Sequence, residues 1–154
     1  MKVKPRRAGK GQINFLAMFT IHTPLPDIIG RRCVKLLCQQ FWHSGVLATD
    51  VNAIIMNLED GSWHKFFFDS SVLFWKQAQL SPAFDTLITD EFHYPSVDLC
   101  ARFPLCGLTV EQVSPLDCGN HVSELRIRFA GGHVLVLREV ADDMKIIHKI
   151  FPAV

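Results

Sequence analysis

The residues that could bind a metal ion lie mostly in the second half of the chain. They follow a C-x5-C-x11-C-x2-H pattern made by Cys100, Cys106, Cys118 and His121. Structural zinc favours ligand pairs two to four residues apart, because one tight loop then presents both ligands at tetrahedral angles. Only Cys118 and His121 meet this spacing, so they are the candidate metal ligands. They could alternatively form a reactive pair, in which the imidazolium of His121 stabilises the thiolate of Cys118. The pattern as a whole predicts neither a bound metal nor a cofactor.

Acidic residues at matching strand ends are the candidates for catalysis. Asp69 ends one predicted hairpin, and Asp142 holds the comparable place in a second one. A two-fold relation between the hairpins would bring these carboxylates together across a cleft, with His148 as a further acid–base candidate. The alternative is that acids at strand ends form turns and hydrate the surface. Because no nucleophile elbow or phosphate-binding loop is present, we favour a non-catalytic protein, with a small enzyme or ligand-binding protein as the alternative.

Aromatic side chains are concentrated between residues 63 and 75. Alternation along a strand cannot bury all of them against one core, so some are expected to meet a partner. The candidate binding residues are Trp63, His64, Phe66, Phe68 and Trp75. Trp63 and His64 lie next to a turn and are expected to be partly exposed. The alternative is a sheet covered on both faces by its own chain.

A weak internal repeat places these residues in the fold. The segment that begins at Val51 matches the segment that begins at Val122 without gaps, and Gly61 aligns with Gly132. Similar stretches precede both segments, which gives repeats at about 28–76 and 105–151. A hairpin pattern that arose twice independently is the alternative.

Each repeat is predicted to contain a hairpin with a two-residue turn. The dipeptides at 60–61 (Asp-Gly) and 131–132 (Gly-Gly) are of the kind that such turns require. This turn places Leu58 opposite Trp63, and the second hairpin takes the equivalent register. The predicted fold class is mainly β, with α+β as the alternative: an antiparallel two-repeat sandwich or half-open barrel with one or two short helices.

The ends and connections of the chain complete the predicted organisation. Residues 1–12 are expected to form a disordered basic tail, and residues 13–154 a single domain. Residues 81–92 are the best helix candidate, because Ser81 can cap the helix and Pro82 suits its first position.

Charge and cysteine usage limit the possible partners. Five of the 16 Lys and Arg residues lie in the first twelve positions, which leaves 11 against 15 acidic residues in the remainder. This excess of acid argues against nucleic-acid binding, apart from weak contact through the tail, and no apolar run is long enough to span a membrane. The five cysteines predict mainly free thiols in the cytoplasm, although a pair such as Cys100 and Cys106 could be bridged. We expect a soluble interaction module that binds a protein partner or itself as a homodimer.

Overall fold

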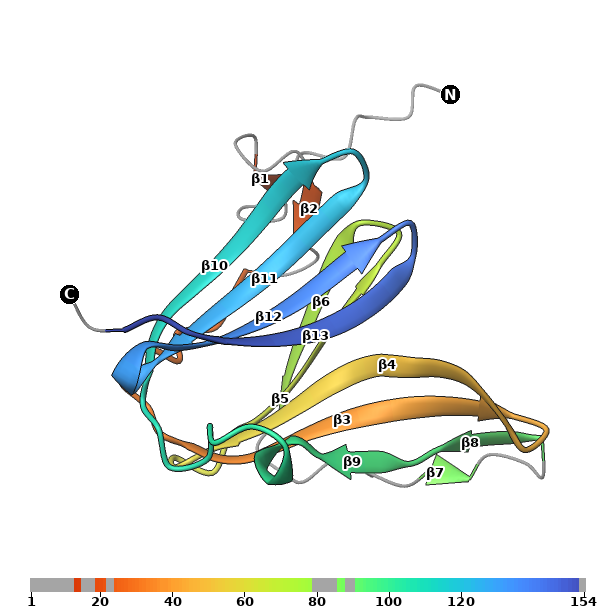
Figure 1. Cartoon of the computed structure of the whole chain (residues 1–154), viewed down its shortest axis with the longest axis horizontal. Coiled ribbons are helices and arrows are strands. Elements are labelled where there is room, and N and C mark those ends of the chain that lie inside the picture. Colours follow the sequence, from red (N-terminus) through yellow and green to blue (C-terminus); the bar gives the residue numbers. More distant parts are fainter. Residues whose placement is uncertain (1–12, 15–18, 22–23, 79–85, 88–90, 153–154) are drawn as a thin grey trace, which may run out of the picture.

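The structure is a computed structural model of the whole chain, and it describes residues 13–14, 19–21, 24–78, 86–87 and 91–152. Over these residues the fold is a mainly β sandwich of two sheets, as the sequence predicts (Figure 1). Two short 3-10 helices, η1 (Leu99–Ala101) and η2 (Ala130–Gly132), are the helical elements of this described part. The predicted tail at 1–12 lies outside the described residues.

The first sheet contains nine strands in the order β1-β2-β6-β5-β4-β3-β8-β7, and β9 also pairs with β3. Its neighbouring strands are antiparallel except for the parallel pair β2 and β6. The strands are β1 (Ile13–Asn14), β2 (Phe19–Ile21), β3 (Cys33–His43), β4 (Val46–Leu58), β5 (Trp63–Asp69), β6 (Val72–Ala78), β7 (Thr86–Leu87), β8 (Phe92–Tyr94) and β9 (Ser96–Asp98).

The second sheet is a four-stranded antiparallel meander in chain order. Its strands are β10 (Val110–Gly119), β11 (Val122–Phe129), β12 (His133–Val140) and β13 (Asp143–Ile150). Strands β3 to β6 of the first sheet are also consecutive and antiparallel. This correspondence is the one expected for the predicted repeats, and the duplication itself stays a prediction.

The two sheets are tied together at one corner. Arg32 forms an isolated antiparallel bridge with Thr109, and the Cys33 amide donates to the Leu108 carbonyl at 2.9 Å. From this corner, which we call the seam, β3 and β4 run below the second sheet while β5 and β6 pass behind it (Figure 1). One apolar core lies between the sheets and includes Ile54, Phe66, Leu125, Phe129 and Leu137.

The register of the β4–β5 hairpin differs by one residue from the prediction. Asn57 pairs with Trp63, and Met56 pairs with His64. The loop has three residues, 59–61, closed by a hydrogen bond from the Leu58 amide to the Ser62 carbonyl at 3.0 Å. A one-residue slip turns each side chain to the other face relative to its partner strand, so His64 and not Trp63 lies beside the core residues of β4.

The β11–β12 hairpin shows the same shift. Arg128 pairs with Val134, which leaves the three residues 130–132 as the loop. Both Gly131 and Gly132 have φ near +80° in this loop. The turn dipeptides therefore predicted the positions of both hairpins correctly, but the predicted loop length of two residues was wrong in each. A three-residue loop that ends in a glycine with left-handed φ contains the same kind of dipeptide as a two-residue turn.

The helix predicted over 81–92 is wrong where the structure describes this segment. Thr86 and Leu87 form β7 and pair with Tyr94 and His93 of β8. Pairing with a neighbouring strand here overrides the local capping signal. Residues 81–85 and 88–90 lie outside the described residues.

The loop between β9 and β10 contains a disulfide between Cys100 and Cys106, whose Cα atoms are 5.7 Å apart. This pair is the one that the sequence left open as a possible bridge. Cys33, Cys38 and Cys118 are free thiols. None of the described segments forms a helix long and apolar enough to cross a membrane.

Candidate functional site

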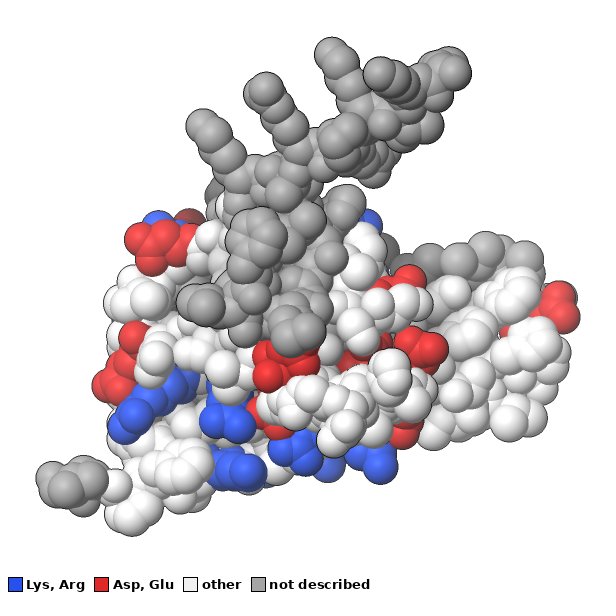
Figure 2. Space-filling view, turned by 90° about the horizontal axis from the view of Figure 1, so that it is seen from above, with Lys and Arg blue, Asp and Glu red and all other residues white. Residues whose placement is uncertain are grey.

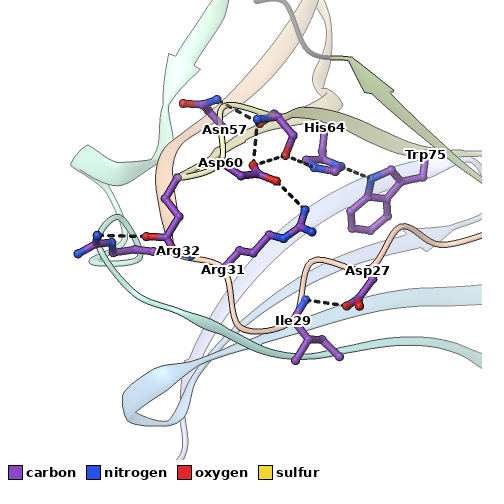
Figure 3. Close-up of polar contacts among 10 residues, drawn as sticks. Asp27, Ile29, Arg31, Arg32, Asn57, Asp60, His64 and Trp75 are labelled. Atoms are coloured by element: carbon purple, nitrogen blue, oxygen red, sulfur yellow. Dashed lines mark hydrogen bonds and ion pairs between the residues drawn. The ribbon is translucent and has the colours of Figure 1, made fainter.

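A chain of hydrogen bonds crosses the interior beside the β4–β5 turn (Figure 3). Trp75 donates its indole N–H to His64 Nδ1 at 2.9 Å, so the neutral imidazole carries its proton on Nε2. That proton is donated to Ser62 Oγ at 2.9 Å, and the Ser62 hydroxyl donates to Asp60 Oδ1 at 2.6 Å. The Arg31 guanidinium contacts the other oxygen of Asp60 at 2.6 Å.

These residue types resemble a catalytic triad, but their order prevents that chemistry. The free lone pair of His64 accepts from Trp75 and cannot take a proton from Ser62. The carboxylate of Asp60 contacts the serine and not the histidine. His64 is 1% exposed and Ser62 is fully buried, so a substrate cannot reach them. Burial lowers the pKa of His64 to about 4. The negative charge of Asp60 acts in the opposite direction, and the positive charge of Arg31 adds to the effect of burial. The chain of hydrogen bonds is therefore structural.

Most of the predicted aromatic binding surface lies in the core. Phe66, Phe68 and Trp75 are at most 3% exposed, and they pack in the cluster between the sheets. The exposure expected for His64 is wrong, and only Trp63 among the five candidates is partly exposed. The physical reason is that β5 and β6 alternate toward a core shared with the second sheet, which accommodates more rings than the sequence suggests.

The charges of the predicted catalytic acids Asp69 and Asp142 both act on Glu139, a residue that the sequence analysis missed. Glu139 of β12 is 2% exposed, and its Oε1 accepts from the Ser71 amide at 2.7 Å. Burial first, and then the charges of Asp142 and Asp69, raise the pKa of Glu139 above its ordinary value. Glu139 could have been found from the sequence, because it is an acidic residue at a core-facing position of an otherwise apolar strand. His148 lies six residues along β13 from Asp142, about 20 Å in extended chain, and does not join them.

The candidate zinc ligands Cys118 and His121 lie at the turn between β10 and β11. Cys118 is exposed near the end of β10, and His121 sits in the following turn with φ +59°. Burial and the Glu124 charge are the largest effects that raise the pKa of the Cys118 thiol, which disfavours a thiolate. Cys100 and Cys106 are bonded to each other. Over the described ranges, no group of three or more His, Cys, Asp or Glu side chains could hold a metal ion.

The outer face of the second sheet carries a group of exposed basic side chains that sequence reasoning also missed. By strand register, five basic residues share the face opposite the core: Arg126 and Arg128 of β11, Arg138 of β12, and Lys145 and Lys149 of β13. We call this surface the basic face. Lys and Arg side chains gather along the lower edge of the molecule in Figure 2. The excess of acid in the rest of the sequence concealed this local clustering.

A buried carboxylate organises the centre of the basic face. Glu124 is 1% exposed, and it accepts from Arg126 Nε at 2.8 Å and from Arg138 Nε at 2.6 Å. Burial tends to raise the pKa of Glu124, but the hydrogen bonds and charges of the two arginines hold it below its ordinary value. The two guanidinium groups are thereby fixed in position while remaining 47% and 35% exposed. Each keeps N–H donors for a ligand outside the protein.

A groove of about 380 Å³ lies on the basic face beside these arginines. Its walls combine hydrogen-bond donors with apolar side chains: Gln112, Ser114, Leu116, Arg126, Arg128, Val134 and Phe151. Phe151 is 50% exposed, and Arg128 is 50% exposed with Glu111 at 3.6 Å. The groove can therefore accept an anionic group next to an apolar one.

A second groove, also of about 380 Å³, lies between the two sheets. It is lined by Asp50 and Val51 at the middle of β4, by Arg102, and by residues 143–146 of β13. Asp69, Asp142 and His148, which the sequence analysis placed at a cleft between the repeats, do not line this groove.

Comparisons with protein-family models, with curated proteins and with solved structures find no match to this chain.

Proposed function

We propose that this protein is a non-catalytic interaction module that binds an acidic segment of a partner protein on the basic face. The observation that carries the proposal is the exposed groove in which Arg126 and Arg128 stand beside Phe151. A fixed guanidinium recognises a carboxylate with paired hydrogen bonds, and an exposed aromatic ring anchors an apolar side chain.

The composition of the face favours a protein segment over a nucleic acid. Apolar Val134, Val136 and Ile147 alternate with the basic residues across the centre of the sheet. Val134 and Val136 are at most 7% exposed, because the long stems of arginine and lysine cover apolar surface. Nucleic-acid sites instead need uninterrupted cations that follow the phosphates, together with aromatic rings that stack on bases.

A second copy of the same face is a poor occupant. Two such faces in a symmetric dimer would bring like charges together, which opposes association. The homodimer predicted from the sequence would therefore have to use another surface. We propose a heterologous acidic partner in its place.

The proposal is tested with a pair of peptides. In one peptide Glu alternates with Val, and in the other Gln replaces every Glu. Fluorescence anisotropy should show binding of the Glu peptide that weakens with added salt, and weaker binding of the Gln peptide. Equal binding of the two peptides, or tighter binding of an oligonucleotide of the same charge, would overturn the proposal.

Matched charge reversals locate the binding surface. Arg128→Glu changes the basic face, while Lys76→Glu makes the same change in charge on β6 of the other sheet, where Lys76 is exposed. We expect at least a tenfold loss of peptide affinity for Arg128→Glu and a small change for Lys76→Glu, since loss of one close charge contact corresponds to about 1.4 kcal/mol or more. Equal losses in the two variants would mean that only net charge matters.

A ligand-binding role for the groove between the sheets is the second candidate. Asp50, Asp143, Arg102 and Lys145 combine both charge signs along its walls, which suits a small zwitterion. A thermal-shift screen with free amino acids tests this role. If a ligand raises the melting temperature of the wild type and of the Arg102→Ala variant by the same amount, this role is wrong.

The cytoplasmic location predicted from the sequence stays a proposal. The Cys100–Cys106 disulfide is the observation that weighs against it, because disulfides are rare in reducing compartments. Thiol labelling of protein taken directly from its native cells distinguishes the two cases: three accessible thiols after denaturation support an oxidising location, and five support the cytoplasm.

A further inference from the structure

Four hydrogen-bonding side chains of the groove on the basic face stand at neighbouring positions of β10 and β11. The register pairs Gln112 with Arg128 and Ser114 with Arg126, and all four residues line the groove. Opposite residues of an antiparallel pair have Cβ atoms about 4.5–5.5 Å apart, and residues two apart on one strand are separated by about 7 Å. The four side chains therefore start from the corners of a compact rectangle on one face of the sheet.

The donors of this rectangle differ in kind and approach from several sides. Each guanidinium has several N–H groups, the Gln112 amide has two, and the Ser114 hydroxyl has one O–H. A carboxylate has two oxygens in one plane, which suits a single guanidinium. A phosphate monoester has three free oxygens and a charge of about −2, so it can accept from several donors at once. The arrangement therefore suits a phosphate better than a carboxylate.

The two arginines are already placed to receive an anion. Arg126 donates from Nε and from Nη2 to Glu124, both at 2.8 Å, which leaves its remaining N–H groups for a ligand. Arg128 is half exposed, and the contact of its Nε with Glu111 is long, at 3.6 Å. Because Arg126 is held by its carboxylate partner, it loses little side-chain freedom when a ligand binds.

Apolar side chains border the same groove. They are Leu116, Val134 and Phe151, and the Phe151 ring is half exposed. An exposed aromatic ring favours contact with a second ring, either stacked or edge to face. The groove volume of about 380 Å³ is large enough for a ring that carries a phosphate, since a cavity of about 150 Å³ accommodates benzene. Among phosphorylated side chains, phosphotyrosine combines the ring with the phosphate, whereas phosphoserine has no ring.

We propose that the groove binds a phosphotyrosine side chain of the acidic partner segment, with the phosphate among the four donors and the ring beside Phe151. This inference rests on the proposed function, because it names the residue of the partner that binds most tightly. Acidic residues next to the phosphotyrosine would contact Arg138 and Lys145, which are paired farther along the basic face.

Three peptides of one sequence test the inference. In each peptide Glu alternates with Val, and the central residue is phosphotyrosine, tyrosine or glutamate. Fluorescence anisotropy with the full chain should show at least about tenfold tighter binding of the phosphotyrosine peptide. Equal affinities of the three peptides would overturn the inference and leave the proposed function intact, whereas no binding of any peptide would overturn both. A phosphoserine peptide that binds as tightly as the phosphotyrosine peptide would also overturn the inference.

Matched substitutions locate the phosphate. Arg126→Lys and Arg138→Lys keep the positive charge, and each replaces an arginine that donates to Glu124, but of the two only Arg126 lines the groove. Lysine presents a point charge in place of the planar fork of arginine. Arg126→Lys should therefore lose most of the preference for phosphotyrosine over tyrosine, and Arg138→Lys should keep it. The same preference in both variants, each shown to be folded by circular dichroism, would contradict this site.

Discussion

The buried histidine His64 should make the stability of this protein strongly dependent on pH. In the folded state the His64 pKa is lowered from 6.5 to about 4, chiefly because the ring is buried. Below pH 6.5 the unfolded chain binds a proton that the folded chain does not. Stability therefore falls as the pH is lowered toward 4, and this contribution is fully present only above pH 6.5.

The size of the effect follows from the two pKa values. Each pH unit between them corresponds to about 1.4 kcal/mol of unfolding free energy, which amounts to about 2 kcal/mol lost between pH 7 and pH 5. His64→Gln removes the titrating group. It also leaves the Trp75 indole N–H without its acceptor, so the variant should be less stable than wild type at pH 7 by about 1–3 kcal/mol.

Urea unfolding of both proteins at pH 7 and pH 5 measures the difference. Wild type should lose about 2 kcal/mol more than His64→Gln over this interval. Other titrating groups, such as Glu139 and His148, are present in both proteins, so their effects cancel in the comparison. His121→Gln changes an exposed histidine and should behave like wild type. Parallel losses in wild type and His64→Gln would refute the assignment of the proton and the hydrogen-bond chain built on it.

Three further predictions concern stability, each measured by urea unfolding at pH 7. Replacing both Cys100 and Cys106 by serine should lower the unfolding free energy by about 2 kcal/mol, the value for a short closed loop; an unchanged value would show that the disulfide is not formed. Gly132→Ala should destabilise more than Gly131→Ala, because both have φ +80° but a Cβ at 132 would lie 1.8 Å from the Phe151 carbonyl oxygen; equal losses would contradict that close approach. Glu124→Gln should lower stability by about 2 kcal/mol, because Arg126 and Arg138 lose a charged acceptor, and a more stable variant would contradict this.

The strand pattern was predictable because alternation and turn residues act locally. Register was not, because a glycine with positive φ closes both two-residue and three-residue loops. Among the two-residue turns, those at Ser70–Ser71, Asn120–His121 and Ala141–Asp142 contain no glycine but have left-handed φ values, and only the one at Ser44–Gly45 in the described part of the chain contains a glycine. Such turns depend on pairing along the flanking strands, which short sequence signals do not encode.

The candidate site was harder to predict than the fold. His64 stood out in the sequence as a functional residue, yet its partners Trp75 and Ser62 make it structural. The basic face depends on side chains from three strands that register alone brings together. The net charge of the chain is a sum over both sheets, so it does not show that basic residues are grouped on one face. For the buried acid Glu139, the sequence did contain a usable signal. It is an acidic residue at a core-facing position of an otherwise apolar strand.

The seam has a consequence for the order in which the chain folds. Strands β10 to β13 connect only to their neighbours in sequence, so the second sheet closes through short loops. The contact between Arg32 and Thr109 joins distant parts of the chain, and its loop-closure entropy is correspondingly larger. We therefore expect the C-terminal meander to form early, and formation of the seam to limit the folding rate. A destabilising change at Thr109 and one in the β12–β13 turn should then both slow folding and change the unfolding rate little.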